Sequence, residues 1–122
     1  MDTILVVDDE IEVCHVLKEF LDLKGYETHI AVNGSDALSK IKEIDPCIVL
    51  LDIIMPGMGG MDVLKEIKEI DPMIGIIMVT AVADHELALR ALELGAYDYI
   101  TKPLNLDYLE LVVLAKIIDL LE

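Results

Sequence analysis

The sequence is poor in basic residues, and this scarcity argues against two classes of binding partner. Only 9 Lys and Arg stand against 24 Asp and Glu, which gives a formal net charge of −15 at pH 7. A surface of this sign repels nucleic acid and anionic membranes. Nowhere do about 18 apolar residues run together, and the opening "MDTILVVDDE" has no basic leader. We therefore expect a cytoplasmic protein that binds neither nucleic acid nor membrane directly.

Cysteine and histidine are also scarce, which argues against a disulfide framework or a zinc site. The two cysteines, Cys14 and Cys47, lie in apolar stretches and have no metal-ligand spacing. They are interpreted as reduced thiols of the core. His15, His29 and His85 are scattered along the chain, and we interpret them as structural or surface residues.

The remaining pattern is that of one α/β domain spanning residues 1–122. A chain of this length that is 55% hydrophobic can form one core but not two. Short apolar runs alternate with amphipathic stretches that end near glycine or before proline. The predicted strands are 3–7, 27–32, 47–51, 75–79 and 97–101. The predicted helices are 11–24, 36–44, 61–70, one from Asp84 to Gly95, and one from Asn105 to the end.

The composition of the strands predicts their order in the sheet. The first, third and fourth are continuously apolar, as expected for parallel strands covered on both faces, whereas the second and fifth alternate like edge strands. This gives a doubly wound five-stranded parallel sheet of order 2-1-3-4-5. Right-handed crossovers place the five helices on both faces, in a flavodoxin-like three-layer sandwich.

Polar residues at the carboxyl ends of these strands predict the site. In this fold ligands bind where the strand order reverses, here between the first and third strands. Asp8 and Asp9 follow the first strand and Asp52 the third, while Thr80 ends the fourth and Lys102 follows the fifth. Three converging carboxylates repel one another, which raises their proton affinity unless a cation is bound. An oxygen-only ligand set favours Mg²⁺ or Mn²⁺ over zinc.

The same residues indicate phosphoryl chemistry at this site. A lysine opposite a divalent cation can neutralise the other side of a phosphoryl group. A carboxylate can act as the nucleophile and become an aspartyl phosphate. We therefore predict that Asp52 is phosphorylated.

Four segments resemble the signature segments of the receiver domain of bacterial response regulators. They are "ILVVDDE", "LLDIIMPGMGG", "VTA" and "GAYDYITKP", and they fall in the order and at the strand ends expected for that family. The resemblance covers essentially the whole chain. It implies a signalling domain of a two-component or phosphorelay system that catalyses its own phosphorylation and dephosphorylation, rather than a stand-alone metabolic enzyme.

The resemblance also implies a donor and a set of metal ligands. Asp52 would receive its phosphoryl group from a histidine of a partner kinase or phosphotransfer protein. Asp9 and Asp52 would bind Mg²⁺ directly, Asp8 would bind through water, and the backbone carbonyl of Ile54 would complete the set.

Further roles follow from the same resemblance. Lys102 would bind a phosphoryl oxygen, and Pro103 would be the cis proline of the family. Thr80 and Tyr99 would form a switch pair, in which Thr80 moves to the aspartyl phosphate and Tyr99 turns inward. Thr80 taken alone is also a typical strand residue, and Tyr99 could simply pack half-buried at the edge.

Two other functions stay open. A Mg²⁺-dependent phosphohydrolase with an aspartyl nucleophile would usually carry a second acid two residues later, but Asp52 is followed by Ile53 and Ile54. A pseudo-receiver that only binds proteins would be expected to lack an acid, the threonine or the lysine, and all of these are present.

The last helix carries two apolar stripes, and the second predicts an interface. The first stripe, assigned to the sheet, consists of Leu109, Val113, Ile117 and Leu120. The second, with the spacing of a coiled-coil seam, consists of Leu111, Leu114, Ile118 and Leu121. In the resembling family the fourth helix, fifth strand and fifth helix form the face that responds to phosphorylation. We expect the second stripe to mediate a homodimer or to bind a following effector segment, unless it packs under a neighbouring element.

Overall fold

The computed structural model describes residues 2–121 and contains five strands alternating with five helices. The elements in chain order are β1 (Thr3–Val7), α1 (Ile11–Leu23), β2 (Glu27–Ala31), α2 (Gly34–Ile44), β3 (Ile48–Leu51), α3 (Gly60–Ile70), β4 (Gly75–Thr80), α4 (His85–Glu93), β5 (Asp98–Thr101) and α5 (Leu106–Leu120).

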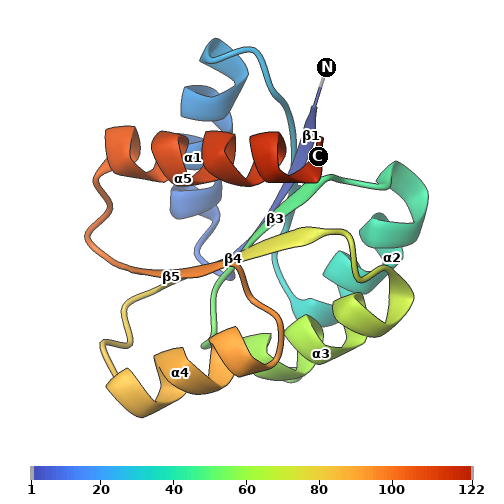
Figure 1. Cartoon of the computed structure of the whole chain (residues 1–122), viewed down its shortest axis with the longest axis vertical. Helices are drawn as coiled ribbons and strands as arrows, with labels where there is room; N and C mark the ends of the chain where they lie inside the picture. The colour runs from blue at the N-terminus through green and yellow to red at the C-terminus, as the bar shows by residue number, and fades with distance from the viewer. Residues whose placement is uncertain (1, 122) are drawn as a thin grey trace.

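The strands form one parallel sheet in the order β2-β1-β3-β4-β5, as the sequence predicts. β3 and β4 are buried along their whole length, whereas the edge strands β2 and β5 are only partly buried. Helices α1 and α5 cover one face, and α2, α3 and α4 cover the other (Figure 1). Each face has its own apolar core, so the three-layer prediction is confirmed.

Three of the helices, α2, α4 and α5, begin after a residue whose side chain caps them. The side chain of Asn33 accepts a hydrogen bond from the Asp36 N–H at 2.8 Å, so α2 begins at Gly34, earlier than the predicted residue 36. Asp84 caps α4 in the same way, and Asn105 caps α5. Caps of this kind satisfy backbone donors that have no partner inside the helix.

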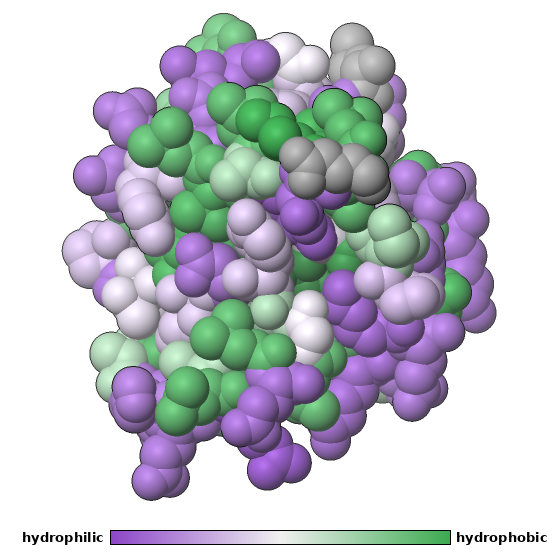
Figure 2. Space-filling model, in the orientation of Figure 1, coloured by the Kyte–Doolittle hydropathy of each residue, from purple (hydrophilic) through white to green (hydrophobic). Residues whose placement is uncertain are grey.

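The two predicted stripes of α5 behave differently. Leu109 and Val113 are fully buried against the sheet. The second stripe lies in solvent, with exposed fractions from 45% to 82%; it comprises Leu111, Leu114, Ile118 and Leu121. Apolar side chains gather over α5 in the space-filling view (Figure 2). The predicted exposure of the second stripe is therefore confirmed. Within residues 2–121, no helix is both long and apolar enough to span a membrane.

Candidate functional site

The site residues are placed by backbone hydrogen bonds that extend the sheet beyond its strands. The N–H of Asp52 donates to the Val7 carbonyl at 3.0 Å, and the N–H of Lys102 donates to the Thr80 carbonyl at 2.8 Å. The N–H of Asp8 likewise donates to the carbonyl of a β2 residue at 3.1 Å. Strand ends predicted to meet at one edge of the sheet do so.

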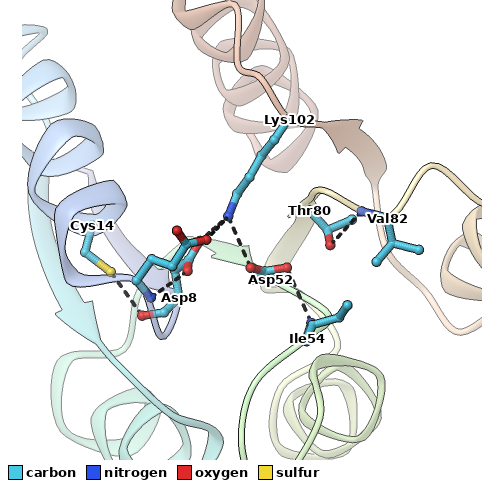
Figure 3. A network of polar contacts seen from close by, with 8 residues as sticks. Asp8, Cys14, Asp52, Ile54, Thr80, Val82 and Lys102 are labelled. Carbon is cyan, nitrogen blue, oxygen red and sulfur yellow. Dashed lines mark hydrogen bonds and ion pairs between the residues drawn. The ribbon is translucent and has the colours of Figure 1, made fainter.

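Lys102 is the centre of the site. Its Nζ lies 2.8 Å from Asp8 Oδ2, 3.2 Å from Asp52 Oδ2 and 3.5 Å from Glu10 Oε1. In Figure 3 the lysine extends from the end of β5 into the space between Asp8 and Asp52. The side chains of Asp8 and Asp52 are almost completely buried. This arrangement confirms that the two carboxylates and the lysine share one crevice.

The electrostatics of the crevice reflect burial and charge pairing. Burial favours the neutral form of Lys102, but its hydrogen bonds and charge interactions with Asp8 and Asp52 outweigh burial and raise its pKa above the ordinary value. Burial raises the pKa of the Asp8 carboxyl, and the charge of Asp52 adds to this shift. Hydrogen bonds from Lys102 and from the N–H of Glu10 act in the opposite direction.

The sequence predicts that Asp8, Asp9 and Asp52 converge, but the structure brings Glu10 into the cluster in place of Asp9. One oxygen from each of Asp8, Glu10 and Asp52 lies within 4.8 Å of the others. Asp9 is not part of this cluster; it is exposed and lines a neighbouring pocket together with Asn33. Glu10 is the site residue that sequence reasoning missed, although it is the third acid of "VVDDE".

This donor set fits a hard divalent cation. All its ligand atoms are carboxylate oxygens, and two of the three groups are buried, where their unbalanced charge is costly. The backbone N–H of Ile54 donates a hydrogen bond to Asp52 Oδ1 at 3.4 Å, which helps to orient the acid. The clustered oxygens of Asp8 and Asp52 are therefore of the kind that a hard divalent cation prefers.

The start of α3 packs closely against the backbone of Asp52. A Cβ at Gly60 would lie 2.0 Å from the Asp52 carbonyl oxygen, so only glycine fits at this first residue of α3. The N–H of Gly60 also donates to the Ile53 carbonyl at 2.8 Å. Gly60 thus allows the start of α3 to pack directly against the backbone of Asp52.

Thr80 and Tyr99 are joined through the segment that follows β4. The Thr80 hydroxyl is buried and accepts a hydrogen bond from the Val82 N–H at 3.3 Å, on the side of Asp52 away from Asp8 (Figure 3). The half-buried Tyr99 donates its hydroxyl hydrogen to the Val82 carbonyl at 2.5 Å. Both side chains therefore contact the same residue of the β4–α4 loop.

The remaining predicted residues lie around the site or outside it. The thiol of Cys14 donates to the Asp8 carbonyl at 3.3 Å, and burial raises its pKa to about 11. Cys47 is only half-buried and lies away from the crevice. The peptide bond between Lys102 and Pro103 is cis, as the resemblance implies.

Comparison with known proteins gives one consistent result. The family described as "Response regulator receiver domain" matches residues 4–114. Regulatory protein AtoC of Escherichia coli (strain K12) is 44% identical over 113 residues, which cover 93% of this chain and 24% of AtoC. Transcriptional regulatory protein ZraR of Salmonella typhimurium is 43% identical over 107 residues, covering 88% of this chain and 24% of ZraR.

The similarity extends to solved structures. The crystal structure of a two-component response regulator from Clostridium difficile superimposes with a TM-score of 0.92 at 32% identity, covering 96% of each chain. The present chain spans about a quarter of the length of AtoC and ZraR, so the similarity to them concerns one region of those proteins.

Proposed function

The chain belongs to the family of response regulator receiver domains, the phosphoryl-accepting domains of two-component systems, and on this premise we propose that Asp52 is the acceptor. The observation that supports this most strongly is the position of its carboxylate. Asp52 directly follows the buried strand β3, and its carboxylate lies 3.2 Å from the ammonium group of Lys102. A buried carboxylate next to a fixed positive charge is suited to be a nucleophile for phosphorus.

The proposed reaction transfers a phosphoryl group from a phosphohistidine of a histidine kinase or a histidine phosphotransfer protein. A carboxylate oxygen of Asp52 attacks the phosphorus and forms the new O–P bond. The N–P bond breaks, and its electron pair returns to the imidazole of the donor. Lys102 neutralises charge on the phosphoryl oxygens as they pass between donor and acceptor.

Asp8, Asp9, Asp52 and the carbonyl of Ile54 are proposed as the protein ligands of Mg²⁺ or Mn²⁺. The clustering of Asp8 with Asp52 supports two of these, and Asp9 is the exposed neighbour of the pair. The cation would supply positive charge to the phosphoryl oxygens in addition to that of Lys102.

The output is proposed to pass through Thr80 and Tyr99 to the face formed by α4, β5 and α5. Both side chains bind Val82, so a movement of Thr80 toward a phosphorylated Asp52 would disturb the loop that also holds Tyr99. The exposed second stripe belongs to α5, one of the three elements of this face. We propose that the stripe binds a second copy of the chain or a following effector segment, according to the state of Asp52.

Phosphorylation with acetyl phosphate and Mg²⁺, followed by intact mass measurement, tests the proposal. Wild type should gain a labile adduct of about 80 Da, as expected for one phosphoryl group. Asp52→Asn should gain none while keeping its fold, because the side chain keeps its size and loses a repelling charge. Asp62→Asn, the same change at an exposed position of α3, is the matched control.

Each outcome of this experiment decides between functions. An Asp52→Asn protein that labels like wild type would show that the acceptor lies elsewhere. A wild-type protein that never labels would favour the pseudo-receiver. Steady release of inorganic phosphate with rapid turnover of many phosphate esters would favour the phosphohydrolase.

A further inference from the structure

Glu10 has a fixed backbone and a free side chain at the mouth of the crevice. Its N–H donates to Asp8 Oδ1 at 2.9 Å. Its carbonyl accepts from the N–H groups of Val13 at 3.0 Å and Cys14 at 3.2 Å, which close the first turn of α1. The Glu10 side chain is 65% exposed, yet its carboxylate reaches back to Lys102. The carboxylate can therefore leave Lys102 without any change in the backbone.

The ammonium group of Lys102 has three hydrogens and faces three carboxylates. A phosphoryl oxygen that binds Lys102 must displace one of them. Asp8 makes the shortest contact and is 3% exposed, and Asp52 is itself the acceptor. Glu10 makes the longest contact, 3.5 Å, and its carboxylate is readily hydrated once released. Of the three carboxylates, Glu10 is therefore the one whose displacement from Lys102 requires the least free energy.

We propose that Glu10 is a positioning residue for phosphoryl transfer, which holds Lys102 in the unphosphorylated state and opposes the entry of a phosphoryl group. The proposal rests on the proposed function of Asp52. The negative charge of Glu10 acts in two ways: it competes for the Lys102 ammonium, and it repels the dianionic group that arrives beside it. Both effects favour the unphosphorylated form.

The expected size of the effect follows from Coulomb's law. One oxygen of Glu10 lies within 4.8 Å of one of Asp52. Charges at the edge of a protein interact through a dielectric between those of protein and water, and salt screens them. Removing the Glu10 charge should therefore accelerate phosphorylation by roughly three- to tenfold at low ionic strength. The gain should shrink as salt is added, because Glu10 is exposed.

The test compares Glu10→Gln with Glu19→Gln, which removes the same charge from an exposed position farther along α1. Phosphorylation rates are measured at saturating Mg²⁺ with two small donors, dianionic acetyl phosphate and the less highly charged phosphoramidate. Glu10→Gln should accelerate the reaction with acetyl phosphate more than that with phosphoramidate, and more at low salt than at high salt. Glu19→Gln should match wild type with both donors.

A second measurement is independent of phosphorylation. In metal-free protein, the NMR signal of the Lys102 ammonium reports how fast its hydrogens exchange with water. Exchange should be several-fold faster in Glu10→Gln than in wild type, because one of three hydrogen-bond acceptors is weakened, and unchanged in Glu19→Gln.

The outcomes separate this inference from the proposed function. If wild type labels at Asp52 but Glu10→Gln labels at the same rate, or both donors are accelerated equally at all salt concentrations, the role of Glu10 is refuted and that of Asp52 stands. Equal acceleration by Glu19→Gln would assign the effect to net charge and also refute the inference. If wild type takes no phosphoryl group from either donor, both proposals fail.

Discussion

Replacing Lys102 with methionine should destabilise the protein, even though the lysine lies at the mouth of the crevice. Methionine keeps much of the length of the side chain but removes the only positive charge that contacts Asp8 and Asp52 among the described residues. These two acids are 3% and 7% exposed. The variant leaves two buried carboxylates that repel each other and have lost their cationic partner.

The magnitude can be worked out from the burial of the group. Removing one partner of a buried ion pair typically costs about 3–5 kcal/mol. We expect about 3 kcal/mol here, because the Lys102 side chain retains 15% exposure and water can reach part of the vacated space. For a domain of this size, each kcal/mol lowers Tm by roughly 3–6 °C, so a loss of about 3 kcal/mol should lower Tm by about 9–18 °C.

The assay is thermal unfolding followed by circular dichroism, with chelator and with Mg²⁺. Lys102→Met should gain more from Mg²⁺ than wild type does, because a cation bound by the carboxylates offsets their repulsion. Lys65→Met, at an exposed position of α3, is the matched control and should melt like wild type. If Lys102→Met melts within about 2 °C of wild type in chelator, the reasoning from the buried ion pairs is wrong.

Three further predictions concern the metal, the interface and the buried thiol. Asp8→Ala or Asp9→Ala should gain less in Tm from Mg²⁺ than wild type, and equal gains would remove that residue from the ligand set. The double variant Leu111→Glu plus Ile118→Glu should still be phosphorylated but should form no phosphorylation-dependent dimer in sedimentation analysis. If wild type is monomeric in both states and the double variant is unfolded, the stripe belongs to the core. The folded protein holds the Cys14 thiol proton more tightly than the unfolded chain, so stability should decline as pH rises from 9.0 toward about 11, a decline that should be weaker in Cys14→Ala.

The fold was predictable because the composition of each strand indicates whether it is central or at an edge of the sheet. "IVLL" of β3 is apolar at every residue and is central, whereas "ETHIA" of β2 alternates and is an edge. Once the order is known, the strand ends that meet are determined. The convergence of Asp8, Asp52 and Lys102 could therefore be predicted from the sequence.

The part that could not be predicted depends on side-chain rotamers. Asp9 and Glu10 follow the same strand end, and no periodic pattern says which carboxylate turns toward Lys102. The choice depends on where α1 begins. Glu10 occupies the N-cap position of α1 and its side chain reaches Lys102, while Asp9 lines the pocket near Asn33. The exact partner of Tyr99, the Val82 carbonyl, likewise depends on the path of an irregular loop.

The charge of the crevice explains why its chemistry should depend on a cation. Three carboxylates facing one ammonium leave an excess of negative charge, part of it buried. Replacing the single charge of Asp52 with a phosphoryl group of nearly two negative charges would increase that excess. Lys102 already pairs with the three carboxylates, and no second basic side chain among the described residues pairs with them. A divalent cation held by Asp8 and Asp52 would supply the missing positive charge. Because phosphorylation increases the negative excess, we expect Mg²⁺ to raise the rate of phosphorylation strongly and to raise the stability of the unphosphorylated fold only modestly.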